Sequence, residues 1–248
     1  MKLSIIIPAH NEKRRIEKTI QAYHQFFTEQ QKNNLLDFEL VVVLNGCTDN
    51  TLAIVESLCK QLPTIVIVNL ADAGKGLAIK AGFAAALKRT NDLIGFVDAD
   101  MATSPEAFYV LTQNIVPNDG VIASRYMPGA LVSPPRPWYK RWGSRIIYEP
   151  LVKLLFNLSY YDLQCGAKVF KRKTVETIVP HLVVHGWAID LELLYLCKKY
   201  RLYIKELPTV WHDQTDSKLT MGAGMRMLGA VFGLRLWHSP LRFLFRNR

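Results

Sequence analysis

The chain has 248 residues, of which 50% are hydrophobic, and it carries a formal net charge of +10 at pH 7. This length fits one large α/β domain or a core with an appendage, and the apolar fraction is sufficient for a substantial core. No internal repeat or low-complexity block is visible, which excludes a repeat protein. The positive charge favours an anionic partner such as nucleic acid, a nucleotide or an anionic lipid surface.

Apolar strands alternate with amphipathic helices in the first half of the chain. The expected strands cover residues 3–8, 38–44, 64–70, 93–97 and 120–124. The expected helices cover residues 12–31, 48–62 with Thr48 as N-cap, a stretch that opens at the glycine loop 73–76, and 104–115. This alternation predicts a doubly wound, mostly parallel sheet, whose ligands bind at the carboxyl ends of the strands.

Two carboxylates follow the strand that ends at Val97. Asp98 and Asp100 are separated by one small residue, so they share a face if the extended backbone continues. Two carboxylates this close repel each other unless a cation lies between them, and oxygen ligands of this kind suit Mg²⁺ or Mn²⁺ with phosphate oxygens in the remaining positions. The alternative is a loop in which Asp98 caps the next helix.

The pattern changes after residue 125. Residues 128–145 combine prolines, basic residues and tryptophans, which predicts an irregular basic loop. A stripe at helical spacing follows, which is either a core helix or a membrane contact, and the basic, tryptophan-rich loop favours the membrane interface. The stripe consists of Tyr148, Leu151, Val152, Leu155 and Phe156. Residues 167–170 and 202–207 then predict strands, and helices are expected from Val175 and over 188–199.

The C-terminal residues 221–248 form an amphipathic, basic tail. Between Lys218 and Arg248 there are six basic residues and no acidic one, interleaved with aliphatic as well as aromatic residues. This composition favours a membrane surface over nucleic acid. The stripe at helical spacing is Met225, Leu228, Val231, Phe232 and Leu236. Three interpretations remain open: packing on the domain or disorder, an in-plane lipid anchor, which is favoured, and docking to a separate membrane subunit.

Cysteine usage and hydropathy indicate the compartment. The four cysteines show no CxxC or metal-type spacing, which predicts reduced thiols in a cytoplasmic setting. The apolar N-terminus is interrupted by Pro8 and a charged run, which suits a first strand better than a signal peptide. No segment reaches the roughly 18–20 apolar residues that span a bilayer. We therefore expect a peripheral protein at the cytoplasmic face of a membrane.

Several short motifs, in order, carry a family resemblance. Residues 4–12, 45–51, 74–76 and 98–100 resemble the nucleotide-sugar domain of family 2 glycosyltransferases, which have the GT-A fold. Residues 124–126, 162–170 and 186–194 resemble the polyprenyl-phosphate branch of that family, and within it the dolichyl-phosphate glucosyltransferases. The resemblance covers residues 3–220. It implies a catalytic domain over 1–220, in which 128–165 is a basic, amphipathic segment on the acceptor side.

The resemblance also implies roles for individual residues. The set expected to bind the sugar nucleotide is Pro8, Ala9, Glu12, Asn45, Asp49, Lys75 and Asp98. Asp100 is expected to bind Mg²⁺ or Mn²⁺ on the diphosphate, with Gln164 as second ligand. The acceptor side is expected to use Arg125, Lys168 and Arg172 for the lipid phosphate, with Asp190 orienting a sugar hydroxyl or accepting a proton.

Two departures from the family pattern touch the donor pocket. The usual pair of aspartates after the second strand is Leu44-Asn45 here, so a carboxylate is replaced by an amide. In addition, Asp72-Ala73 stands where an Asn-Lys pair is common.

The expected reaction is attack of a polyprenyl phosphate oxygen on the anomeric carbon of a sugar nucleotide, with inversion, and the donor most in keeping with the resemblance is UDP-glucose. A phosphate is anionic near neutral pH, so this reaction needs no strong base. Three alternatives are kept: GDP-mannose or another donor, a soluble glycan or protein acceptor, and a non-catalytic module that binds nucleotide sugars or lipid surfaces. Nucleic acid is not an expected partner.

Overall fold

The computed structural model describes residues 1–134, 149–213 and 221–239, with side chains omitted at 149 and 221–228. The strands are β1 Lys2–Ala9, β2 Asp37–Asn45, β3 Ile65–Leu70, β4 Leu93–Val97, β5 Gly120–Ser124, β6 Leu131–Ser133, β7 Ala167–Lys171, β8 Ile204–Pro208 and β9 Val210–His212. The helices are α1 Ile16–Lys32, α2 Thr51–Gln61, α3 Lys75–Leu87, α4 Pro105–Gln113, α6 Glu149–Phe156, α7 Arg172–Ile178, α8 Ile189–Lys199 and α9 Met221–Trp237. The basic loop lies largely outside these residues.

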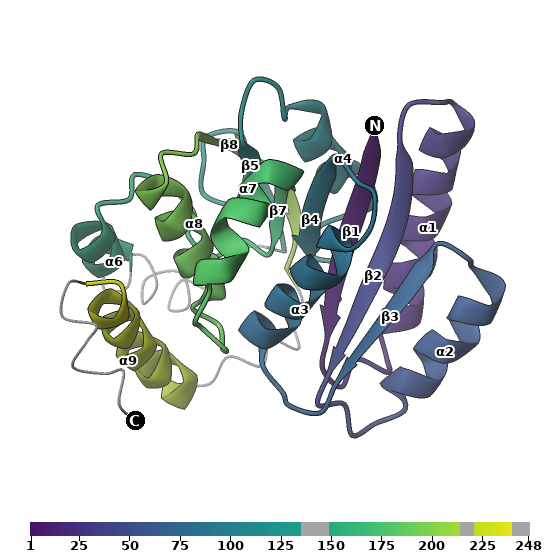
Figure 1. Cartoon of the computed structure of the whole chain (residues 1–248), viewed down its shortest axis with the longest axis horizontal. Coiled ribbons are helices and arrows are strands. Elements are labelled where there is room, and N and C mark those ends of the chain that lie inside the picture. The colour runs from purple at the N-terminus through teal and green to yellow at the C-terminus, as the bar shows by residue number, and fades with distance from the viewer. Residues whose placement is uncertain (135–148, 214–220, 240–248) are drawn as a thin grey trace.

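One sheet organises the described part of the chain (Figure 1). Seven strands pair in the order β3-β2-β1-β4-β7-β5-β8. All neighbouring pairs are parallel except those that involve β7, which is antiparallel to β4 and β5. The prediction of a mostly parallel, doubly wound α/β sheet is confirmed. A separate short sheet pairs β6 with β9.

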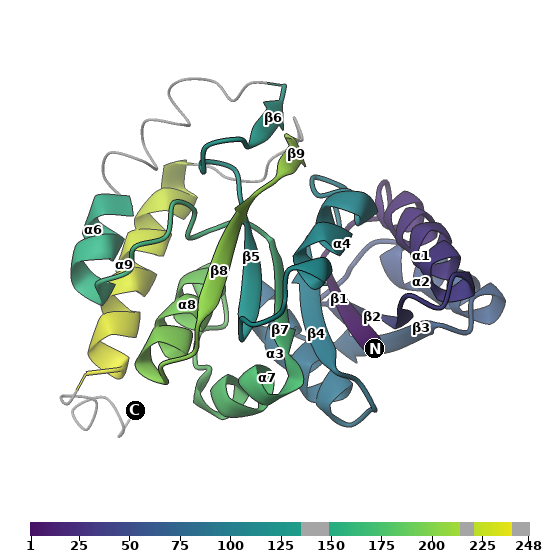
Figure 2. The same cartoon turned by 90° about the horizontal axis from the view of Figure 1, so that it is seen from above.

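Helices cover both faces of the sheet, and each face has its own core (Figure 2). Helices α1, α2 and α4 pack on one face, where the predicted stripe of α1 is fully buried at Ile16, Ile20, Tyr23 and Phe27. Helices α3, α7 and α8 pack on the other face, and α6 and α9 extend that second core. Because both faces are covered, the central strands are largely apolar, as the sequence pattern indicated, with Ser4, Glu39 and Lys168 as buried exceptions.

Two helices begin later than the sequence pattern predicts. Helix α1 begins at Ile16 rather than residue 12, because Asn11 has a positive φ of 53° and the Glu12 carbonyl accepts two backbone bonds in a turn. The expectation that Thr48 caps α2 is wrong, since the helix begins at Thr51 and the Thr48 N–H donates to the Asn11 side chain instead. Both differences lengthen the loops at the carboxyl edge of the sheet.

The predicted helical stripe after the basic loop is partly a core element. In α6, Val152 and Phe156 are buried in the second core, whereas Leu154 is 80% exposed. Helix α9 lies beside α6 in both views and buries Val231 and Leu234 in the same core. The predicted stripe residues Phe232 and Leu236 are exposed instead. None of the helices in the described residues is both long enough and apolar enough to cross a bilayer.

Candidate active site

The predicted loops converge at the carboxyl edge of the sheet. Ala9 lies opposite Leu44 in neighbouring parallel strands, so the segments that follow β1 and β2 leave the sheet together. Strand β7 runs the other way and places Ala167 opposite Val97, which brings residues 164–166 to the same edge. The Asp98 N–H donates to the Gly166 carbonyl at 3.1 Å. A segment some 70 residues later in the chain thereby borders the aspartate pair.

Asp98 is held against the backbone of Gly166. A Cβ atom added to Gly166 would lie 1.9 Å from Oδ2 of Asp98, so only glycine permits this approach. The other carboxylate oxygen lies 2.9 Å from the Nζ atom of Lys75, at the start of α3. The side chain of Asp98 is therefore fixed between the β7 backbone and an ammonium group, and it does not cap the following helix, whose N-cap is Ser104.

Asp98 ends a row of four alternating charges, in which Lys168 and Asp190 are buried. Lys168 Nζ donates to Asp190 Oδ1 at 2.6 Å, and Lys75 Nζ donates to Asp190 Oδ2 at 3.2 Å while also pairing with Asp98. Burial by itself would raise the pKa of Asp190, but the charges of Lys168 and Lys75 outweigh it and lower that pKa. Burial likewise disfavours the Lys75 ammonium, yet Asp190 and Asp98 raise its pKa. For both Asp190 and Lys75, the opposite charges beside them favour the ionised form.

This arrangement corrects two predicted roles. The Lys168 side chain is 0% exposed and also donates to the Cys165 carbonyl, so the expectation that it contacts the acceptor phosphate conflicts with its burial. Asp190 has one lysine on each carboxylate oxygen and a lowered pKa, which makes it a poor proton acceptor. In the structure both residues position Lys75 and, through it, Asp98.

Arg125 follows β5 at the same edge and forms a buried ion pair. Its Nε and Nη2 atoms donate to the two carboxylate oxygens of Asp162 at 2.7 and 2.9 Å, and its side chain is 8% exposed. The guanidinium also lies over the rings of Tyr126 and Trp211, and its contact with an acceptor phosphate stays a prediction. The expected role of Arg172 is wrong, because this residue follows β7 at the opposite edge, where its N–H donates to the Asp92 carbonyl.

Asn45 and Ala9 support the donor side rather than line it. The Asn45 amide donates to the Ala9 carbonyl at 2.9 Å and accepts from the Gly74 N–H at 3.0 Å. Both residues are buried, which contradicts the expectation that they contact the nucleotide. The amide that replaces a carboxylate here has a structural explanation, because a carboxylate could not donate to the Ala9 carbonyl.

The remaining donor-side residues lie in the two lengthened loops. Asp49 accepts bonds from Thr51 and from the Lys13 N–H, and although burial opposes it, these bonds lower its pKa. Glu12 pairs with Arg15, with the Glu12 Oε2 and Arg15 Nη2 atoms 2.6 Å apart. Pro8 is partly exposed next to these loops. Their contact with a nucleotide stays a prediction.

Asp100 fits a divalent cation. Burial and the neighbouring charge of Asp98 raise the pKa of the Asp100 carboxyl, and among the described residues this carboxylate forms no ion pair. A hard cation would offset this excess negative charge. In the described part of the chain, no group of three or more His, Cys, Asp or Glu side chains is placed to hold a metal. The ligation of a cation by Asp100 together with Gln164 stays a prediction.

The sequence analysis did not assign a role to the loop of residues 182–188, which lies against the start of α3. The N–H groups of Gly76 and Leu77 both donate to the His185 carbonyl, and a Cβ atom on Gly76 would lie 2.3 Å from the Val184 carbonyl oxygen. The glycines thus form a tight turn that is packed against the backbone of residues 184–185. Trp187 ends this loop, with its ring 5.5 Å from Lys75 Nζ. The sequence signal that could have identified Trp187 is its position inside the motif at 186–194.

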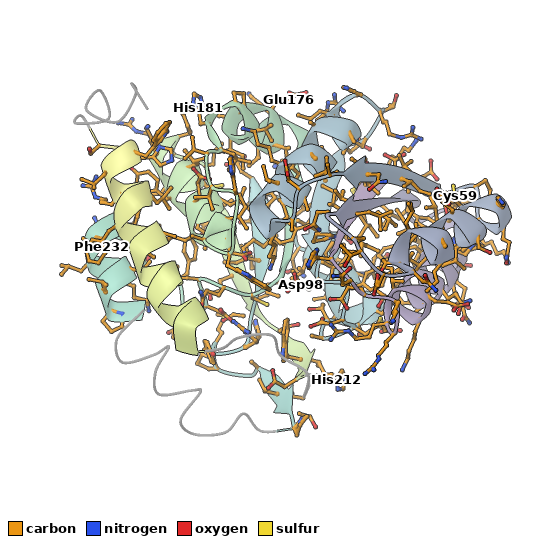
Figure 3. All side chains as sticks on the ribbon, turned by 90° about the horizontal axis from the view of Figure 1, so that it is seen from below. Cys59, Asp98, Glu176, His181, His212 and Phe232 are labelled. Carbon is orange, nitrogen blue, oxygen red and sulfur yellow. The ribbon has the colours of Figure 1, made fainter. Side chains whose placement is uncertain are left out.

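Strand β9 borders the aspartate loop through the backbone of His212. Its backbone N–H donates to the Ala102 carbonyl at 2.8 Å, two residues after Asp100. Figure 3 labels both His212 and Asp98. This proximity joins β9 to a loop more than 100 residues earlier in the chain, which no local sequence pattern encodes.

Comparison with known proteins agrees with this geometry. A family model described as glycosyl transferase family 2 matches residues 4–179. A dolichyl-phosphate beta-glucosyltransferase of Trichomonas vaginalis is 28% identical, over 99% of this chain and 76% of its own length. A dolichyl-phosphate beta-glucosyltransferase of Dictyostelium discoideum is 32% identical, over 88% of this chain and 68% of its own length.

Solved structures show the same fold. A glucosyl-3-phosphoglycerate synthase from Mycobacterium tuberculosis, in complex with Mn²⁺, UDP and phosphoglyceric acid, superposes with a TM-score of 0.70 at 18% identity, over 95% of this chain and 77% of that one. A mannosyl-3-phosphoglycerate synthase from Rubrobacter xylanophilus has a TM-score of 0.66 at 18% identity, over 100% of this chain and 76% of that one. With the family model covering well over half of its residues, the chain belongs to glycosyltransferase family 2 and has the GT-A fold.

Proposed function

We propose that the protein transfers glucose from UDP-glucose to the phosphate of a polyprenyl or dolichyl phosphate, with inversion at the anomeric carbon. The observation that carries the proposal is the approach of Gly166 to Asp98, which precedes Asp100 by two residues. A donor-side aspartate pair and a segment typical of the lipid-phosphate branch thereby border one site. The names of the relatives, dolichyl-phosphate beta-glucosyltransferases, support the same donor sugar and acceptor.

Different residues at the carboxyl edge of the sheet would bind the donor and the acceptor. Asp100 and Gln164 would hold Mg²⁺ or Mn²⁺, and such an ion supplies Lewis-acid stabilisation of the departing diphosphate. Lys75 places a fixed positive charge beside Asp98, on the donor side. The acceptor phosphate is already anionic, so the weak basicity of Asp190 does not impede attack. Arg125 would bind this phosphate through Nη1, because Asp162 holds the other edge of its guanidinium rigidly.

A lipid acceptor requires access to a membrane surface, and α9 supports one. Between residues 229 and 237 its exposed positions carry no charged side chain, and they include Phe232, Leu236 and Trp237. Phe232 points away from the body of the molecule (Figure 3). This face belongs to the segment with six basic residues and no acidic one, a charge that complements an anionic bilayer. We infer peripheral association through α9 at the cytoplasmic face of a membrane.

The function is tested by label transfer. Purified protein is incubated with Mg²⁺ or Mn²⁺, a polyprenyl phosphate and radiolabelled UDP-glucose or GDP-mannose, and label entering the organic phase is counted. We expect transfer from UDP-glucose, its loss in Asp100→Ala, and its retention in Asp37→Asn, which alters an exposed carboxylate at the opposite edge. Label from GDP-mannose alone would refute the donor. Transfer to a water-soluble acceptor without lipid would refute the acceptor, and nucleotide binding without any transfer would favour a binding module.

Membrane association has its own test. The protein is sedimented with vesicles of phosphatidylglycerol and phosphatidylcholine. We expect Phe232→Glu to reduce binding, and Val110→Glu, at a comparably exposed apolar position on α4, to leave it unchanged. Equal binding to vesicles of phosphatidylcholine alone, or equal loss in both variants, would contradict the inference.

A further inference from the structure

Trp187 is a large aromatic side chain left exposed beside the most highly charged part of the site. It is 53% exposed, and its recorded ring contact is with the Lys75 ammonium, 5.5 Å from the ring centroid. That ammonium is bonded to both Asp98 and Asp190. The Lys75 ammonium therefore lies between the indole and the carboxylates of Asp98 and Asp190. About half of the Trp187 surface is exposed and can contact a ligand.

The loop that presents this indole is anchored along its backbone. Glu192, which is fully buried, accepts bonds from the N–H groups of Val183 and Val184 at 2.9–3.1 Å. Lys80 donates to the Leu182 carbonyl at 2.7 Å, and the first turn of α3 donates to the His185 carbonyl. Trp187 thus follows a segment fixed from both sides. A ligand that stacks on it would not have to order the loop first.

A flat aromatic face next to a carboxylate and an ammonium is complementary to a pyranose. The ring of glucose presents axial C–H groups on both faces and equatorial hydroxyls around its edge. The C–H face packs on an indole as other apolar surface does, while the hydroxyls need charged or polar partners. The Lys75 ammonium supplies such a partner below the Trp187 ring, and Asp98, which pairs with that ammonium and is partly exposed, supplies another. The indole N–H forms no hydrogen bond with the described part of the chain and is a further donor.

We propose that Trp187, with the Lys75 ammonium beneath its ring, forms the subsite that binds the hexosyl group of the sugar nucleotide. The inference rests on the proposed function, since it assigns the sugar half of the donor. Its specific content is that Trp187 contacts the sugar and not the base, the diphosphate or the lipid. A purely structural role, shielding the Lys75 ammonium, makes a different prediction, because disturbing Lys75 and Asp98 would weaken binding of the nucleotide itself.

The test compares binding of UDP and UDP-glucose by calorimetry, with Mn²⁺ present. The variants are Trp187→Ala, Trp187→Leu and Trp187→Phe, and the control is Tyr203→Ala, another exposed aromatic residue, bonded through its backbone to Asp119 before β5. We expect UDP affinity within about twofold of wild type in all four. UDP-glucose affinity should fall about five- to tenfold in the Ala and Leu variants and recover in the Phe variant, as loss of an aromatic stacking contact requires.

The outcomes separate the inference from the function on which it rests. Wild-type protein that binds UDP-glucose no better than UDP, and transfers no glucose, would refute the proposed function. With wild-type transfer intact, unchanged UDP-glucose affinity in Trp187→Ala would overturn the hexose subsite alone. An equal loss for UDP and UDP-glucose would replace it with the shielding role. A change confined to the KM of the lipid acceptor would move Trp187 to the acceptor side.

Discussion

Replacing Asp162 by Asn tests the buried ion pair that fixes Arg125. The Asp162 carboxylate accepts both guanidinium bonds and also the backbone N–H groups of Arg125 and Gln164, each at 3.0 Å. An amide keeps the shape but leaves the arginine charge buried without a counter-charge. Removing one partner of a buried pair costs about 3–5 kcal/mol of unfolding free energy.

The pKa shift of Asp162 gives a similar magnitude for this loss of unfolding free energy. Burial alone would raise the pKa of this carboxyl, but Arg125 and the backbone donors lower it to about 2. Since each pKa unit corresponds to about 1.4 kcal/mol, this lowering corresponds to roughly 2–3 kcal/mol of stabilisation of the charged form. We therefore expect Asp162→Asn to lose at least that much stability at neutral pH.

Stability is measured by urea unfolding at pH 7.5, and the unfolding free energy is obtained from the midpoint and the slope of the transition. Glu176→Gln is the matched control, because Glu176 pairs with Arg172 in a half-exposed i,i+4 bridge worth about 0.5 kcal/mol. An Asp162→Asn loss no larger than the Glu176→Gln loss would refute the buried pair. The double variant Arg125→Met, Asp162→Leu should recover part of the stability, since it removes both buried charges.

Three further predictions follow from the packing. Gly166→Ala should lower transfer about a hundredfold by displacing Asp98, whereas Gly229→Ala, where a Cβ meets nothing within 4 Å, should leave it unchanged; equal rates would contradict the close approach. Asn45→Asp should cost about 1–3 kcal/mol in thermal or urea unfolding, because it sets a carboxylate against a backbone carbonyl. Burial raises the pKa of the Cys197 thiol to about 12, so a thiol reagent at pH 8 should modify Cys197 only after unfolding, and peptide mapping that finds label on Cys197 of the native protein would argue against its burial.

The sequence by itself determined the fold class and the edge of the sheet that carries the site. Apolar strands alternating with amphipathic helices require a sheet covered on both faces, and the polar motifs after Ala9, Leu44 and Val97 then fall at one edge. These are local patterns with a fixed period, which is why they can be read without coordinates. The family motifs, which add chemistry to this frame, were sufficient for the assignment that the comparisons confirm.

Only the tertiary structure decided which charges meet. Lys168, on β7, and Asp190, on α8, had been given separate acceptor roles, yet they form one buried pair. Arg172 was grouped with Arg125, but the antiparallel direction of β7 carries it to the far edge. The sequence alone does not show which partner a charged side chain will contact. Its role depends on burial and on a counter-charge brought from a distant segment, and both arise only when the strands pair and the helices pack.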